Sequence, residues 1–68
     1  MQIIDARGLS CPEPVILTRQ ALTSSEAAYQ VIVDNNTSKE NVTRYAHHQG
    51  YEVTISEQDG EYTLSLSK

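Results

Sequence analysis

Hydrophobic and polar residues alternate along two segments near the C-terminal end of the chain, residues 51–56 and 62–67. The apolar positions are Tyr51, Val53, Ile55, Tyr62, Leu64 and Leu66. A period of two is typical of β-strands that bury one face and expose the other. Asp59-Gly60 lies between the segments and suits a two-residue type I′ turn, whose central residues both need positive φ. The pattern predicts a β-hairpin.

Two shorter apolar runs predict two more strands. The segment from Gln2 to Ala6 is centred on Ile3 and Ile4 and is followed by a turn-forming glycine. The segment from Gln30 to Asp34 is rich in β-branched residues, as interior strands are, and two asparagines that favour a turn follow it.

A helix is predicted between the second strand and the hairpin. Residues 37–40 fit a capping box, in which the Thr37 hydroxyl serves the N3 amide and Glu40 reaches back to the N-cap N–H. Apolar residues then recur at helical spacing at Val42, Tyr45 and Ala46. Gly50 provides the C-terminal stop.

Another helix is predicted to follow the first strand. Pro12 suits its first position, where the backbone N–H has no partner within the helix, and Pro14 lies within the same tolerant turn. The residue before a proline prefers extended geometry, which places Cys11 at the N-cap. The apolar residues beyond cover a broad arc rather than a stripe, and the helix is expected to end near residues 23–25.

The resulting order is β-α-β-α-β-β. Right-handed crossovers would place both helices on one face of a four-stranded mixed sheet, with the polar residues of the strands facing solvent on the other. The sequence therefore predicts a two-layer α/β sandwich formed by a single domain over residues 1–68.

The composition excludes several classes of functional site and binding partner. The 68 residues include one cysteine, which excludes an internal disulfide, a CxxC redox pair and a four-cysteine zinc site. Five Lys and Arg against nine Asp and Glu give a formal net charge of -4, which argues against direct binding of nucleic acid. A basic leader and a long apolar stretch are lacking, so we expect no membrane partner and a cytoplasmic, thiol-reducing compartment.

Cys11 is the residue whose chemistry needs explaining. A thiol at a helix N-terminus faces free N–H groups and the positive end of the helix dipole, which favour a thiolate or persulfide anion. Ser10 and Glu13 are polar, and Gly8 and Ser10 suit a surface turn, whereas a lone cysteine elsewhere is more often a buried apolar residue. Arg7 either adds positive potential near the sulfur or pairs with Asp5 or Glu13.

Other candidate residues are expected to be structural. His47 and His48 are adjacent on a helix, point about 100° apart and cannot share one metal site, even with Cys11 added. A Cys-His couple for hydrolysis would need a histidine from one helix end beside the start of another. The four tyrosines are expected to pack rather than to form a stacking platform for bases. The sequence predicts no metal and no cofactor.

The segment from Asp5 to Pro14, DARGLSCPEP, resembles the signature of the TusA/SirA/YedF family of small sulfur carriers, whose hallmark is a Cys-Pro-x-Pro motif opening the first helix. The resemblance covers essentially the whole chain. Residues 33–35, 40–44 and 50–53 are similar to the amino-terminal domain of YedF-type proteins, a branch linked to selenium metabolism. In such proteins a DsrE-like domain can follow, so this chain can be an excised domain.

The resemblance implies a two-layer β-α-β-α-β-β fold and a role for Cys11. That thiol would accept sulfane sulfur, or selenium, from a cysteine desulfurase and pass it to an acceptor protein such as a DsrE-like domain. Pro12 and Pro14 would hold the loop rigid, with Arg7, Gly8 and Glu13 in support. Such a chain is a sulfurtransferase-type carrier rather than an independent enzyme. Thiolated tRNA, a cofactor or a cluster could be the final product.

A second interpretation stays open. The chain can be a non-catalytic protein-interaction or regulatory module in which Cys11 is incidental. A carrier needs an exposed, nucleophilic Cys11, whereas such a module tolerates its replacement by serine.

Overall fold

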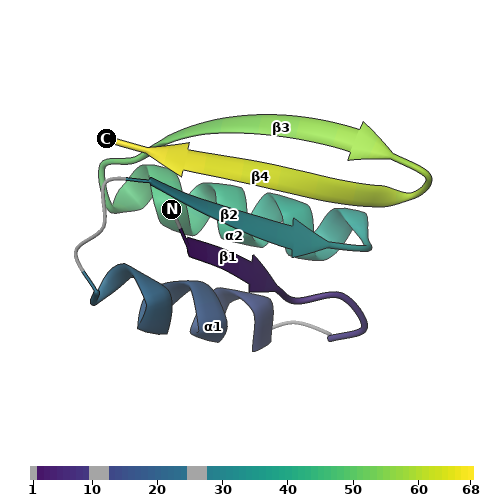
Figure 1. Ribbon diagram of the computed structural model, residues 1–68, viewed down its shortest axis with the longest axis horizontal. Helices are drawn as coiled ribbons and strands as arrows, with labels where there is room; N and C mark the ends of the chain where they lie inside the picture. The colour runs from purple at the N-terminus through teal and green to yellow at the C-terminus, as the bar shows by residue number, and fades with distance from the viewer. Residues whose placement is uncertain (1, 10–12, 25–27) are drawn as a thin grey trace.

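The computed structural model describes residues 2–9, 13–24 and 28–68. Its helices and strands follow the predicted β-α-β-α-β-β order (Figure 1). They are β1 (Gln2–Asp5), α1 (Glu13–Leu22), β2 (Ala28–Val33), α2 (Asn36–His48), β3 (Glu52–Gln58) and β4 (Glu61–Ser67).

The four strands form one mixed sheet in the order β1-β2-β4-β3. β1 pairs parallel with β2, and β4 lies between β2 and β3, antiparallel to both. In Figure 1, α2 runs behind β2 and β4, while α1 lies alongside β1. The predicted four-stranded mixed sheet with two helices is confirmed.

The core lies between the helices and one face of the sheet. Alternate residues of β2 are fully buried, as are the two leucines of β4 that pair with them. Apolar residues of both helices complete the core, and α1 and α2 also contact each other. The fully buried residues of this sheet face are Tyr29, Val31, Val33, Leu64 and Leu66. The opposite face carries mostly polar, partly exposed side chains, as the alternation predicts.

The start of α2 corrects the predicted capping box. Asn35, not Thr37, is the N-cap: it has φ -151° and ψ 157°, and its side chain accepts a hydrogen bond from the Ser38 backbone N–H at 2.7 Å. Thr37 lies inside the helix, and Glu40 accepts a bond from the side-chain amide of Asn36 at 2.7 Å. Asparagine caps as well as serine or threonine does, so the N-cap of α2 lies two residues earlier than the capping-box pattern indicated.

The end of α2 confirms the predicted glycine stop. Gly50 has φ +87° and donates its N–H to the His47 carbonyl at 3.0 Å, while the Tyr51 N–H bonds to the Ala46 carbonyl at 2.9 Å. This pair of bonds is a Schellman motif, which satisfies carbonyls that the helix leaves free. Tyr51 then turns inward and is buried against Tyr29, with ring centroids 6.0 Å apart.

The hairpin forms with the predicted turn, but its first strand is more exposed than its alternation indicates. Asp59 (φ +53°) and Gly60 (φ +79°) link β3 to β4, and both take the positive φ that a type I′ turn requires. β3 is an edge strand, and Ile55 is 43% exposed. The expectation of a half-buried strand is therefore wrong for most of β3, in which Val53 alone is partly buried and packs against the core.

The described part of α1 begins at Glu13 and ends at Leu22, one residue before the predicted end. Pro14, Thr18 and Ala21 are its buried residues, and the Thr18 hydroxyl donates to the Pro14 carbonyl at 2.9 Å. The predicted helix start at Pro12, with Cys11 as N-cap, lies outside the described residues.

Candidate functional site

The loop that leaves β1 leads to the Cys-Pro-Glu-Pro motif and extends the sheet for one residue. Ala6 is fully buried, and its N–H donates to the Ile32 carbonyl at 2.8 Å, which continues the parallel pairing of β1 with β2. Leu9 folds back toward Ala6, with 3.4 Å between its nitrogen and the Ala6 carbonyl oxygen, and packs against the core. The chain thus approaches the motif from a fixed position.

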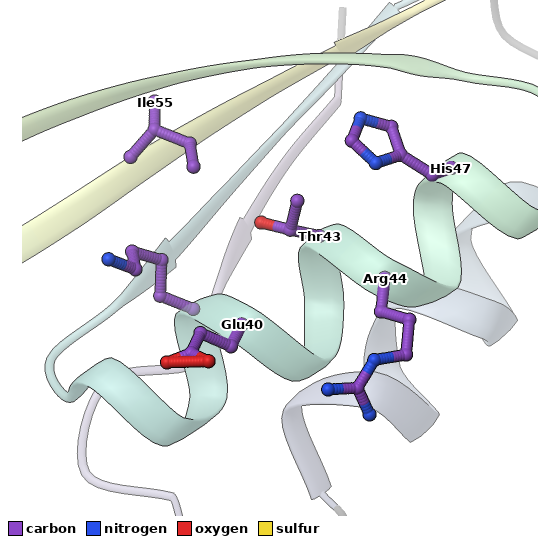
Figure 2. A pocket seen from close by; sticks show the side chains of 6 residues that line it. Glu40, Thr43, Arg44, His47 and Ile55 are labelled. Atoms are coloured by element: carbon purple, nitrogen blue, oxygen red, sulfur yellow. The ribbon is translucent and has the colours of Figure 1, made fainter.

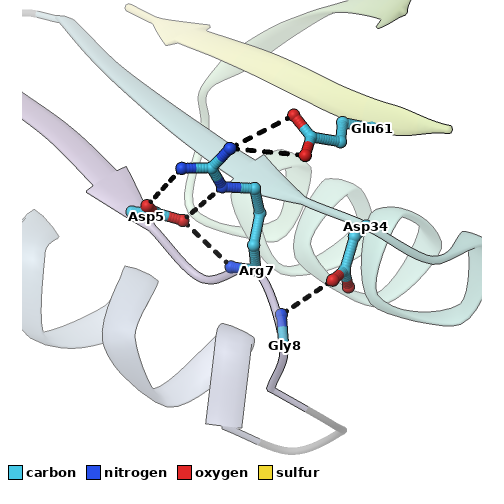
Figure 3. Close-up of polar contacts among 5 residues, drawn as sticks. All are labelled: Asp5, Arg7, Gly8, Asp34 and Glu61. Atoms are coloured by element: carbon cyan, nitrogen blue, oxygen red, sulfur yellow. Dashed lines mark hydrogen bonds and ion pairs between the residues drawn. The ribbon is translucent and has the colours of Figure 1, made fainter. Parts of the chain in front are cut away.

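Arg7 ties this loop to two strands. Its guanidinium donates to both carboxylate oxygens of Asp5, at 2.9 and 2.7 Å, and its backbone N–H bonds to the same carboxylate at 3.1 Å. Its third nitrogen reaches the carboxylate of Glu61, at the start of β4, with 3.3 Å to each oxygen (Figure 3). Arg7 therefore links the end of β1 to the start of β4.

The electrostatics of this cluster follow from those contacts. Hydrogen bonds from the side chain and then the backbone N–H of Arg7 hold the pKa of the Asp5 carboxyl at about 2, below its ordinary 3.8. The same bonds with Asp5, and then those with Glu61, raise the pKa of the Arg7 guanidinium. All three side chains are about half exposed, so solvent screens their attraction and the cluster fixes geometry more than it adds stability.

Gly8 is held by a second carboxylate. Its backbone N–H donates to Oδ2 of Asp34 at 2.8 Å, and Asp34 directly follows β2 (Figure 3). Gly8 has φ +80°, a conformation that side-chain-bearing residues rarely adopt. The glycine lets the chain turn toward α1, and Asp34 satisfies the N–H that the turn exposes.

The motif continues into α1 on the far side. Pro14 is fully buried, whereas Glu13 is exposed in the first turn of the helix. The chain is therefore packed at Leu9 before the motif and at Pro14 within it. Cys11 and Pro12 lie outside the described residues, so their predicted roles stay predictions, as do the supporting roles of Arg7, Gly8, Glu13 and Pro14.

Two anchoring residues, Asp34 and Glu61, were not among the predicted site residues. A signal for Asp34 exists in the sequence, since the carboxyl ends of neighbouring parallel strands meet at one edge of a sheet. Glu61 carries no comparable signal, because its place beside Arg7 depends on β4 lying next to β2. Of the alternatives that the sequence leaves open for Arg7, the structure shows the pairing with Asp5, and a second carboxylate partner is Glu61.

The histidines and tyrosines singled out in the sequence take the exposed and packed positions expected of them. His47 and His48 are exposed, Tyr29 and Tyr51 are buried, and Tyr45 and Tyr62 are partly buried. Within residues 2–9, 13–24 and 28–68, no three His, Cys, Asp or Glu side chains gather as metal ligands would. In the same residues, neither helix is long and apolar enough to cross a membrane.

Known proteins resemble this chain in sequence and in fold. The protein described as "Putative sulfur carrier protein MJ0990" of Methanocaldococcus jannaschii is 33% identical over 71 residues, an alignment that covers all of this chain and 95% of that protein. The crystal structure of the SirA-like protein from Desulfitobacterium hafniense superposes with a TM-score of 0.90 at 37% identity, covering 98% of this chain and 96% of that one. The family model for sulfurtransferase TusA matches residues 2–68, and the chain belongs to the TusA family of sulfur carriers.

Proposed function

We propose that this chain carries sulfane sulfur as a persulfide on Cys11 and passes it to an acceptor protein. The observation that supports this most is the match to the TusA family across residues 2–68, a range that includes the Cys-Pro-Glu-Pro motif. The anchored loop supports it further, because Arg7 and Gly8 are tied to neighbouring strands just before the motif. A pre-positioned loop lowers the ordering cost of docking against another protein's cysteine.

Both transfer steps balance without an external oxidant. The Cys11 thiolate attacks the terminal sulfur of a persulfide on the donor, a new S–S bond forms, and the donor cysteine leaves as a thiolate. An acceptor thiolate then attacks the terminal sulfur held on Cys11, and Cys11 leaves as a thiolate in turn. One cysteine suffices for this exchange, whereas a dithiol oxidoreductase needs a second, resolving thiol.

The donor in this proposal is a cysteine desulfurase, and the acceptor is a protein thiol such as that of a DsrE-like domain. The proposal also includes a cytoplasmic location and a finer assignment to the amino-terminal domain of YedF-type proteins, with selenium as an alternative cargo. The final product can be thiolated tRNA, a cofactor or a cluster.

Intact-mass spectrometry tests the loading step. The protein is incubated with a cysteine desulfurase and cysteine, and Cys11→Ser serves as the matched variant. We expect the mass of one added sulfur atom on the wild type, removed by dithiothreitol and absent from the variant. If the desulfurase turns over and the wild type gains no sulfur, the carrier function is contradicted and an interaction module with an incidental cysteine is favoured.

A further inference from the structure

A groove separates α2 from the outer strand β3, away from the loop that carries Arg7 and Gly8. Its volume is about 330 Å³. In Figure 2, Thr43 lies between Ile55 of β3 and Arg44 of α2, and His47 marks one end. The lining residues are Lys39, Glu40, Thr43, Arg44, His47 and Ile55.

The groove exists because the sheet is wider than the helix layer that covers it. Ile4, Val31, Leu64 and Ile55 are paired in register across the four strands. The first three are at most 9% exposed, whereas Ile55 is 43% exposed. The alternation of β3 directs Ile55 to the same face of the sheet as Leu64. Its apolar side chain therefore lies beside α2 but stays partly exposed to solvent.

The charge of the groove is opposite to that of the whole chain. Two of the five Lys and Arg residues line it, in a chain whose formal net charge is -4. The Lys39 ammonium lies 4.8 Å from the centre of the Tyr62 ring, and Arg44 is exposed without an ion-pair partner among the described residues. The one lining carboxylate, Glu40, already accepts a hydrogen bond from Asn36.

Thr43 adds an unused polar group. Its hydroxyl oxygen is buried without a hydrogen-bond partner in the part of the chain that the structure describes, and it points toward the space between α2 and β3 (Figure 2). Buried polar groups normally have a partner, because leaving one unpaired costs free energy.

We propose that this groove binds an acidic peptide segment of a partner protein. One apolar side chain of the segment packs against Ile55. One of its carboxylates faces Lys39, and another reaches Arg44, whose side chain extends from α2 away from Ile55 (Figure 2). Charge complementarity selects this occupant, because two cationic residues line a groove that also exposes Ile55, on a chain whose formal net charge is -4. Nucleic acid would meet the repulsion of the surrounding carboxylates. The proposal is independent of Cys11 and its sulfur chemistry.

NMR titration of the ¹⁵N-labelled protein with a blocked Asp-Glu-Leu-Asp-Glu-Leu peptide tests the site. We expect amide shifts concentrated on α2 and β3, and a binding constant that weakens as sodium chloride screens the charges. The control peptide carries Asn and Gln in place of Asp and Glu. Shifts located elsewhere, equal binding of both peptides or no binding at millimolar peptide would each overturn the proposal.

Two exposed helix arginines provide a matched pair of variants. Arg44→Glu places a carboxylate in the groove, whereas Arg19→Glu makes the same charge change on α1. We expect Arg44→Glu to weaken binding about fivefold to tenfold and Arg19→Glu less than about twofold. Ile55→Thr keeps β-branching, removes apolar surface and should also weaken binding several-fold. Equal effects of the two arginine variants would contradict a site in the groove.

A second copy of this chain is the competing occupant, since the hairpin end carries Glu57, Asp59 and Glu61. Sedimentation of the protein alone distinguishes the two cases. We expect a monomer across the concentrations used for the titration. A concentration-dependent dimer that Arg44→Glu abolishes would overturn binding of a partner peptide and assign the groove to self-association.

Discussion

Arg7 and Gly8 in the loop after β1 are exposed, and so is most of the outer strand β3, but the two regions differ in the polar contacts that they make. The loop is tied down by polar contacts: Arg7 bridges Asp5 and Glu61, and Asp34 holds the Gly8 N–H. β3 leaves Ile55 uncovered beside a groove with two cationic side chains. Solvent exposure alone therefore does not distinguish a region held in place from one that is free to bind another molecule. The number of hydrogen bonds and ion pairs within the chain does.

We infer that the two regions have different roles: the loop positions the motif with Cys11, and the groove beside β3 recognises a partner. A thiol that exchanges sulfur with another protein's cysteine benefits from a loop whose position is set before docking. A recognition groove benefits from unsatisfied apolar and charged groups that a partner can cover.

Leu64 and Ile55 are cross-strand neighbours that differ in burial. Truncating each to alanine compares the stability that a covered and an uncovered side chain contribute. Leu64→Ala removes a fully buried side chain and should lower the free energy of unfolding by about 3 kcal/mol. Ile55→Ala should lower it by less than about 1 kcal/mol, because solvent already reaches that side chain. Urea denaturation measures both, and equal losses would show that β3 is covered in solution.

Gly8→Ala tests the backbone of the loop. At φ +80° the new side chain should destabilise the fold by about 1 to 2 kcal/mol, although its Cβ would have no heavy atom of the described residues within 4 Å. Gly50→Ala is the matched control, since Gly50 has φ +87° and equal space. We expect similar losses of stability, but a changed rate of Cys11 alkylation by iodoacetamide only in Gly8→Ala. The same alkylation rate in both variants would show that the backbone conformation of Gly8 does not affect the reactivity of Cys11.

Asp34 tests the second anchor. Asp34→Ala removes the acceptor of the Gly8 N–H and should cost about 0.5 to 1 kcal/mol, a small value because the bond is exposed to solvent. Hydrogen exchange of the Gly8 amide should become faster. Asp34→Asn keeps a carbonyl oxygen at that position and should retain most of the protection. Unchanged exchange in Asp34→Ala would show that the bond does not form in solution.

Asp5 provides the smallest effect on stability and a direct readout of charge. Its pKa of about 2 in the folded protein lies below the ordinary 3.8, so its contribution to stability is present above pH 3.8 and is lost as the pH falls toward 2. NMR titration of the Asp5 carboxyl should show this low value, and Arg7→Gln should return it toward 3.8. A wild-type pKa near 3.8 would contradict the Arg7 cluster.

The elements set by local chemistry were predictable from the sequence. Gly50 ends α2, and Asp59-Gly60 forms the turn between β3 and β4, because positive φ strongly favours glycine and a few polar residues. The cap of α2 was predicted two residues too late, because Asn35 and Thr37 both suit that position. Local patterns therefore located the elements more reliably than their first residues.

Features that depend on tertiary arrangement were less predictable. The alternation around Ile55 indicates which way it points, but not that α2 stops short of covering it. Glu61 reaches Arg7 only because β4 lies between β2 and β3, a strand order that the hairpin pattern does not specify. The motif containing Cys11 was evident from the sequence alone, whereas the residues that anchor its loop required the structure.

Cyanolysis measures whether Cys11 holds a sulfur atom that another nucleophile can take. The protein is loaded by a cysteine desulfurase, separated from it and treated with cyanide, which attacks the terminal sulfur and leaves the Cys11 thiolate. We predict one thiocyanate per loaded wild-type chain and none from Cys11→Ser treated in the same way. Equal thiocyanate from both proteins, or none from either while the desulfurase is active, would show that Cys11 does not carry transferable sulfur.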